Sequence, residues 1–161
     1  MLVSKAIAQI RERINDEFDT GYTDSVLIDY INDAVKYLSS ALIQRNDPIL
    51  VDEVDVGQNI PVDIPKNFVR TAGGFPVMRK RGKFYITDGS PVVTVKYFFI
   101  PDEVIATTDS LPFEGDDVYQ TLIVKLASIY AINQHEYDIN QDEALKSQLE
   151  QLLIQALGAV T

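Results

Sequence analysis

Three groups of residues have side chains suited to acid–base or metal chemistry. His135 is the single histidine of the chain, and an acidic residue follows it. Two pairs of carboxylates stand elsewhere, at Asp116 and Asp117 and at Asp142 and Glu143. A histidine acts as a general base on a nearby nucleophile, and no obvious one accompanies His135 in the sequence. Both carboxylate pairs fall where helices are expected to start, and acidic side chains stabilise that end of a helix. These residues therefore predict helix ends rather than a catalytic site.

Metal-binding and phosphate-binding motifs are incomplete. Residues 138–142 match the first half of a calcium loop, D-x-N-x-D. The sixth position of such a loop needs glycine and the twelfth needs glutamate, but this chain has Glu143 and Leu149 there. The glycine pair Gly73 and Gly74 precedes a phenylalanine and a proline instead of the G-K-[ST] of a phosphate loop. The chain also has no cysteine. We therefore expect no metal, no cofactor and no enzymatic activity.

The strongest local anomaly is a cluster of four cations. Arg79, Lys80, Arg81 and Lys83 fall within five residues, together with a glycine that is typical of a hairpin tip. Two interpretations stay open. The cluster is either a solvated tip without a function, or a contact element that grips phosphates or an acidic protein surface. These four residues are candidate partner-binding residues.

Charge is distributed unevenly along the 161 residues, which carry 14 basic and 24 acidic side chains and a net charge of −10. Residues 66–100 have a net charge of +6, whereas residues 23–65 have −6 and residues 101–161 have −9. A protein that wraps DNA is expected to be basic over a whole face, so most of this surface would repel DNA. Either the charges are solvated, or the basic segment of one copy meets an acidic surface of another.

Apolar residues recur at helical spacing in four segments. This periodicity predicts helices over residues 3–17, 24–45, 116–135 and 141–157. The β-branched and aromatic residues at 92–100 predict a strand. No apolar stretch reaches the roughly 20 residues of a membrane span, and the first five residues lack the apolar core of a signal peptide. We therefore expect no membrane contact.

The expected fold class is α+β, a predominantly helical bundle built by helices from both termini. Residues 1–161 are expected to form a single domain. Within it, residues 1–47 and 116–161 form the bundle, residues 48–101 form a central β-rich insert, as a hairpin or meander, and residues 102–115 form a loop. The bundle is expected to bury one common set of apolar side chains: Leu27, Ile31, Leu38, Leu122, Leu126, Leu149 and Leu153.

The last predicted helix carries more apolar surface than one helix face needs. Its end is apolar on more than one side, and four further residues are candidate partner contacts: Leu152, Ile154, Leu157 and Val160. Two interpretations stay open here as well. All of this surface packs inside the chain, or part of it is available to a partner.

The order of these signals resembles the head–tail adaptor proteins of tailed bacteriophages, also called head–tail connector or neck proteins. Four stretches carry the resemblance. They are GYTDSVLIDYINDA at residues 21–34, IPKNF at 64–68, VKYFFIP at 95–101, and the helical tail over residues 122–157. The first is similar to the family's helix with an aromatic residue, an aspartate and an I-N-x-A step, and the third is similar to its strand with a Y-x-x-x-P ending.

The resemblance implies a structural virion protein without catalysis. Twelve copies would form a ring beneath the portal protein, extend the DNA channel and offer a docking platform to the next neck or tail protein. DNA would pass through the lumen without sequence-specific binding, and the C-terminal helix would contact the portal protein. The protein would reside in the head–tail neck of the virion, and in the cytoplasm of the infected bacterium during assembly.

Two other functions compete with this one. The alternative is a small acidic binding or inhibitor module that masks a basic protein surface, acting as a monomer or dimer. A hydrolase that uses aspartate and glutamate is the third, and the chain offers it no convergent set of polar residues.

Overall fold

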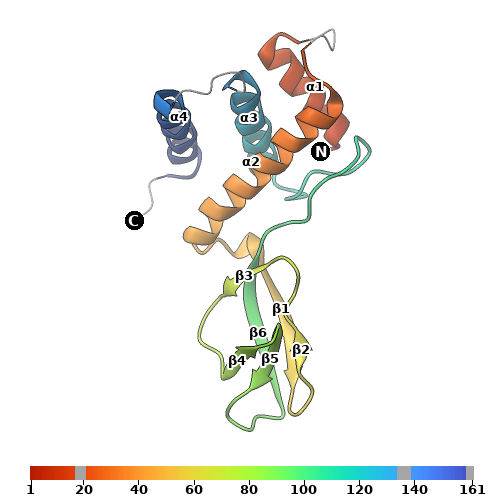
Figure 1. Cartoon of the computed structure of the whole chain (residues 1–161), viewed down its shortest axis with the longest axis vertical. Helices are drawn as coiled ribbons and strands as arrows, with labels where there is room; N and C mark the ends of the chain where they lie inside the picture. Colours follow the sequence, from red (N-terminus) through yellow and green to blue (C-terminus); the bar gives the residue numbers. More distant parts are fainter. Residues whose placement is uncertain (17–20, 134–138, 159–161) are drawn as a thin grey trace. The chain divides into compact units, whose positions relative to one another are not determined.

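A computed structural model describes residues 1–16, 21–133 and 139–158. These residues form four α-helices, a short 3-10 helix and two small three-stranded antiparallel sheets (Figure 1). The helices are α1 (Val3–Ile14), α2 (Asp24–Gln44), α3 (Asp117–Asn133) and α4 (Ile139–Leu157), and the 3-10 helix is η1 (Pro48–Leu50). The strands are β1 (Val51–Gly57), β2 (Val62–Asp63), β3 (Phe68–Thr71), β4 (Val77–Lys80), β5 (Lys83–Ile86) and β6 (Val92–Phe99).

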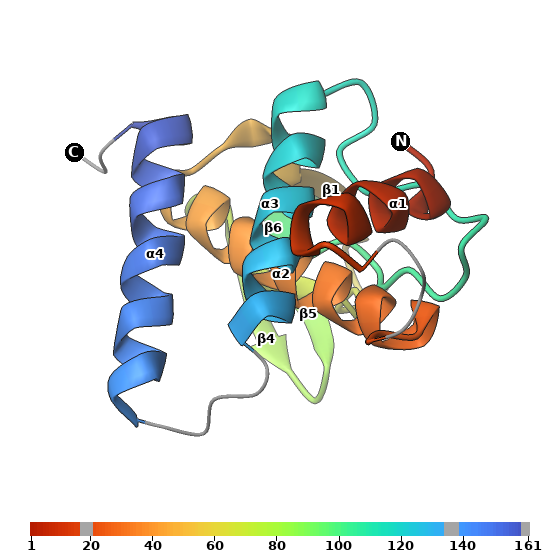
Figure 2. The same cartoon turned by 90° about the horizontal axis from the view of Figure 1, so that it is seen from above.

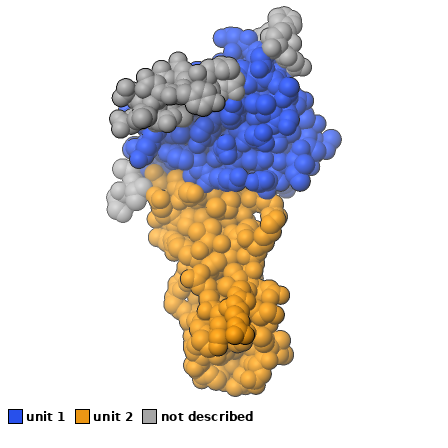
Figure 3. Space-filling view, viewed as in Figure 1, with its two compact units in different colours: residues 1–38, 103–161 blue, residues 39–102 orange. Residues whose placement is uncertain are grey.

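The chain divides into two compact units, which are coloured separately in Figure 3. The helical unit comprises residues 1–38 and 103–161, and the sheet unit comprises residues 39–102. No described helix combines the length and the apolar character that a membrane-spanning helix needs.

The expected fold class, a predominantly helical bundle with a hairpin or meander insert, is wrong. The chain is mixed α/β, with two small antiparallel sheets at its centre. A meander pairs consecutive strands, but the strand orders here are β1-β6-β3 and β2-β5-β4. The physical reason lies in β6, which buries Val93, Val95 and Tyr97 on one face and Phe98 on the other. Such a strand is favoured at the centre of a sheet, between β1 and β3.

The two sheets of the sheet unit share a core of their own. Val56 from β1, Phe84 from β5, and Val93 and Val95 from β6 are buried together. Phe68 of β3 packs edge-on against Phe84, with 5.6 Å between ring centroids. The β-rich segment is therefore a folded unit with its own apolar interior, and the period-2 pattern could not reveal how its strands pair.

The start of α1 depends on the loop at residues 102–115. No side chain caps this helix, and its first N–H groups lack partners within the helix. The N–H of Val3 donates to the carbonyl of Asp109 and that of Ser4 to the carbonyl of Thr107, both at 2.9 Å. The Asp109 carboxylate in turn accepts the N–H groups of Ile105 and Ala106 at 2.8 and 2.9 Å. The loop is therefore a structural partner of α1 rather than a simple linker.

A buried ion-pair cluster joins the end of α1 to the start of α2. The Arg11 guanidinium, which is buried, bonds the Asp16 carboxylate at 2.9 Å and the Asp24 carboxylate at 2.8 Å. Asp16 also accepts the N–H groups of Gly21 and Tyr22. Helix α1 ends at Ile14, because the next residue takes the left-handed conformation that commonly closes a helix.

Within the helical unit, α3 lies between α1 and α4 (Figure 2). Because it has neighbours on more than one side, α3 is buried over much of its surface and shows little amphipathic pattern. Asn32 of α2 is buried and exchanges two hydrogen bonds with the backbone of Val104, at 2.9 and 3.0 Å. The Tyr22 hydroxyl donates to the carbonyl of Ala131 at 2.7 Å. All seven residues expected in the core are buried.

We predict that Leu126→Ala lowers the free energy of unfolding by about 2–5 kcal/mol, because the side chain is 0% exposed and its loss leaves a cavity. Ile132→Ala on the same helix is the matched control. Its side chain is 59% exposed, so the change should stay within about 0.5 kcal/mol. Denaturant unfolding monitored by circular dichroism measures both. A loss below about 0.5 kcal/mol for Leu126→Ala would place this residue outside the core.

The two carboxylates that bond Arg11 offer a second matched pair. Asp16→Ala should cost about 3–5 kcal/mol, because it leaves a buried guanidinium with less compensation. Asp24→Ala should cost about 0–1 kcal/mol, because the Asp24 side chain is 55% exposed. Equal losses for the two variants would contradict the assignment of Asp16 as the buried anchor.

Candidate functional site

The cation cluster forms a tight β-hairpin, as the sequence predicts. Strands β4 and β5 pair in register through Arg79 with Phe84 and Lys80 with Lys83. The two turn residues, Arg81 and Gly82, have φ angles of 51° and 75°. Positive φ at both positions is typical of a type I′ turn, which matches the twist of the flanking strands, and glycine adopts this conformation freely. Arginine is uncommon in this conformation, so local backbone preference does not explain the choice of Arg81.

Two of the four cations have partners inside the sheet unit. Arg79 lies on the inner face of its strand, beside buried Phe84, and its guanidinium sits 5.4 Å from the centre of the Phe68 ring. Such a cation–π contact stabilises the local packing. Lys83 bonds the carboxylate of Asp63, its partner on β2, at 3.3 Å. Arg79 therefore has a structural role, and Lys83 is partly neutralised.

Lys80 and Arg81 differ from these two. Within the described part of the chain, neither the Lys80 nor the Arg81 side chain forms a hydrogen bond or an ion pair. Lys80 stands directly opposite Lys83, and like charges at opposed positions of a sheet are destabilising. Residues 78 and 85 are also opposed and share this outer face. We call Met78, Lys80, Arg81 and Lys83 the basic hairpin face.

Other cations of the basic segment serve the fold. The Arg70 guanidinium stacks on the Phe98 ring, 4.4 Å from its centre. It also donates to the carbonyl of Ile43 and to the Asn46 side chain, both at 2.8 Å. Carbonyl groups in the last turn of a helix lack partners within the helix, and Arg70 supplies a hydrogen bond to one of them at the end of α2. Lys96 stands opposite an acidic residue of β1. The charge of residues 66–100 is thus partly structural, a distinction that counting charges cannot make.

A second charged surface lies on α2 of the helical unit. Asp29 and Asp33 are one helical turn apart and exposed, and like charges at this spacing repel each other. Nearby, Lys36 bonds Glu103 at 2.7 Å. This bond, together with the charges of Asp33 and Asp29, raises the pKa of Lys36.

Two half-buried tyrosines lie close to Asp33, with Tyr37 one helical turn after it on α2 and Tyr130 near enough for its charge to act. Burial raises the pKa of Tyr130, and the negative charge of Asp33 raises it further. Burial likewise raises the pKa of Tyr37, followed by the charge of Glu150. We call Asp29, Asp33, Tyr37 and Tyr130 the acidic α2 face. Sequence reasoning missed this face, although its signal, aspartates at positions i and i+4 of a helix, is visible in the sequence.

The remaining carboxylates proposed for chemistry have structural roles or lie outside the described residues. Asp116 caps α3 by accepting the N–H groups of Val118 and Tyr119 at 3.0 and 3.1 Å. His135 lies outside the described residues, as do the side chains of Asp142 and Glu143. Among the described residues, no group of three or more histidine, cysteine, aspartate or glutamate side chains could hold a metal ion.

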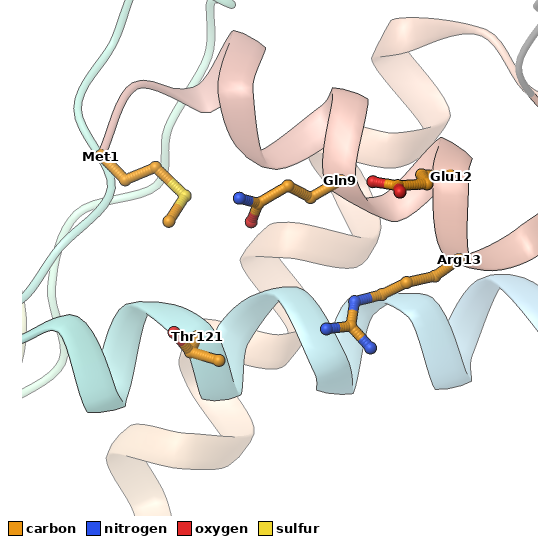
Figure 4. Close-up of a pocket in the computed structure, with 5 residues that line it drawn as sticks. All are labelled: Met1, Gln9, Glu12, Arg13 and Thr121. Atoms are coloured by element: carbon orange, nitrogen blue, oxygen red, sulfur yellow. The ribbon is translucent and has the colours of Figure 1, made fainter.

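A polar depression of about 460 Å³ lies over α1 and α3 (Figure 4). Its lining residues are Met1, Gln9, Glu12, Arg13 and Thr121. The N-terminal amine donates a hydrogen bond to the Gln120 side chain at 2.9 Å. The depression thus offers one carboxylate, from Glu12, and one guanidinium, from Arg13, which stays protonated and cannot act as a base.

The apolar residues of α4 that the sequence offers as partner contacts differ in their exposure. Leu149 and Leu153 face the core, and Ile154 is 51% exposed. Leu152 and Leu157 are half-buried, and Val160 lies outside the described residues. Beside this helix, a depression of about 310 Å³ opens between α3 and α4. Exposed Val118 lines it, so apolar surface of both helices is open to solvent here.

Comparison with known proteins adds no relative. No protein-family model matches the chain, and no curated protein matches it. The likeness to head–tail adaptors therefore stays a prediction from the four sequence stretches.

We predict that Lys80→Glu combined with Arg81→Glu leaves the melting temperature within about 2 °C of the wild type. Neither side chain supports the fold, and a glutamate at position 80 removes the repulsion by Lys83. Arg79→Glu should lower the melting temperature clearly, because it places a carboxylate beside Phe68. Thermal unfolding followed by circular dichroism compares the two. Equal losses would mean that Lys80 and Arg81 also hold the hairpin together.

Proposed function

We propose that this protein is a structural, non-enzymatic subunit of the neck of a tailed bacteriophage. Copies of it form a ring of twelve beneath the portal protein, around the DNA channel, and offer a platform to the next neck or tail protein. The resemblance of residues 21–34, 64–68, 95–101 and 122–157 to head–tail adaptors gives the family. The observation from the structure that supports the proposal best is the separation of charge between the two units.

The helical unit has six basic and seventeen acidic residues, a net charge of −11, whereas the sheet unit has eight basic and seven acidic residues, a net charge of +1. Subunits of a ring contact each other through two different patches, one on each side. A basic hairpin face and an acidic helical unit provide two complementary patches. Acidic walls also suit a channel that lets DNA pass without holding its phosphates.

The end of α4 is proposed as the contact to the portal protein. Exposed Ile154 and the depression beside Val118 offer apolar surface that the helical unit leaves uncovered. Burial of such surface against a partner is favourable by roughly 25 cal/mol for each Å².

The acidic inhibitor module remains the second candidate function. The net charge of −11 on the helical unit favours it, because such a surface attracts basic partners. An inhibitor acts as a monomer or dimer and needs no portal protein, so the two proposals differ in one measurement. The protein is incubated with rings of the portal protein from the same genome and imaged by electron microscopy. A ring of this protein beneath the portal supports the adaptor, and free portal rings would contradict it.

For the portal contact we predict that Ile154→Asp weakens portal binding at least tenfold, a loss of about 1.4 kcal/mol. The variant keeps buried Leu153 and so tests the surface alone, whereas deletion of residues 150–161 also removes part of the core. Ile105→Asp is the control, because Ile105 is 84% exposed and lies outside α4. Surface plasmon resonance on immobilised portal rings measures both. Equal binding by Ile154→Asp and the wild type would rule out this contact.

A further inference from the structure

We propose that the basic hairpin face of one copy docks onto the acidic α2 face of a second copy. This contact rests on the proposed ring, and it names the surfaces through which neighbouring subunits meet. Each surface is defined within its own unit, so the proposal needs no assumption about how the two units of one chain are placed.

The basic hairpin face is arranged as a contact element. The two-residue turn at Arg81 and Gly82 makes the tip narrow. Lys80 and Lys83 lie side by side across the strands, and of these two lysines only Lys83 bonds Asp63, so a negative group that approaches Lys80 relieves the remaining repulsion. Half-exposed Met78 lies on the same face and adds an apolar contact. Arg79 contacts the Phe68 ring and Lys83 bonds Asp63, whereas the Lys80 and Arg81 side chains are available to a partner.

The acidic α2 face carries the opposite charge, and a positive group is favoured there. Asp29 and Asp33 repel each other along one exposed helix face. Lys36 lies nearby, but its ammonium group already bonds Glu103. Tyr37 follows Asp33 by one helical turn, and Tyr130 lies near Asp33. A guanidinium that lies over a tyrosine ring gains a cation–π attraction. A carboxylate pair beside aromatic rings therefore suits an arginine flanked by lysines.

A second copy of the chain is the partner that this charge pattern favours. Nucleic acid matches the hairpin but would be repelled by the helical unit, with its net charge of −11. A second copy supplies the complementary surface and leaves one hairpin and one α2 face free at the two ends of the pair. Such a head-to-tail contact repeats until a ring closes.

Cross-linking between engineered cysteines tests the contact, because the chain has no cysteine of its own. Met78→Cys places a thiol on the hairpin face, and Ser25→Cys places one on α2, one turn before Asp29. Neither change alters a charge. A short bismaleimide added to an equal mixture of the two variants should give heterodimers at least ten times faster than a mixture in which Ser110→Cys replaces Ser25→Cys. Ser110 is an exposed serine on the loop of the helical unit.

Charge reversal then tests the pairing itself. Adding Lys80→Glu and Arg81→Glu to the Met78→Cys chain should reduce cross-linking at least tenfold, as should adding Asp29→Lys and Asp33→Lys to the Ser25→Cys chain. Mixing the two reversed chains should restore it, because the signs are complementary again. Salt at 1 M, where the Debye length is about 3 Å, should suppress the original pair.

Cross-linking at the rate of the Ser110→Cys control, or a reversed pair that stays inactive, would overturn the proposal. These outcomes are separate from the portal test. A protein that forms rings on the portal but fails to cross-link keeps the proposed function and loses this contact. A protein that cross-links as expected but ignores the portal keeps the contact and loses the function.

Discussion

The arrangement of the first two helices depends on the ion pairs of the buried Arg11 guanidinium. A buried cation is tolerated only when carboxylates and hydrogen bonds surround it, and Asp16 and Asp24 meet this need from the end of α1 and the start of α2. Two further polar contacts also join segments that are distant in the sequence. Asn32 binds the backbone of Val104, and Tyr22 binds the carbonyl of Ala131. Directional bonds thus fix which helix meets which segment, and apolar packing fills the space between them.

The sheet unit shows how one strand can direct one set of side chains to the core and another to solvent. Alternation of side chains sends Arg79 inward to the Phe68 ring and Lys80 outward. The inner residues hold the hairpin against the core of Val56, Phe84, Val93 and Val95. The outward-facing residues of β4, such as Lys80, make no contact among the described residues that the fold requires, so a change in their charge does not disturb the core. The same separation recurs on α2, where Ile28 and Ile31 are buried and Asp29 and Asp33 are exposed.

Much of the secondary structure could be predicted from local patterns. Apolar spacing located α2 within one residue, and the glycine of the basic cluster located the hairpin turn. Pairing of distant strands could not be predicted, because β1 and β3 both pair with β6 through backbone hydrogen bonds, which every strand can offer and no local sequence pattern specifies. The early end of α1 depends on the conformation of Asn15. At the candidate site, the cations were visible in the sequence, but the ring beneath Arg79 and the exposure of Asp29 and Asp33 required three dimensions.

The order of the segments along the chain also constrains how the protein folds during synthesis. The sheet unit is one continuous stretch, residues 39–102, whereas the helical unit joins residues 1–38 to residues 103–161. The sheet unit can close its core as soon as β6 leaves the ribosome. Helix α1 must wait for the carbonyls of Thr107 and Asp109, and its apolar face waits longer, for α3. The central sheets can therefore form first, whereas the contact of α1 with α3 joins segments on either side of them and must wait for the later part of the chain.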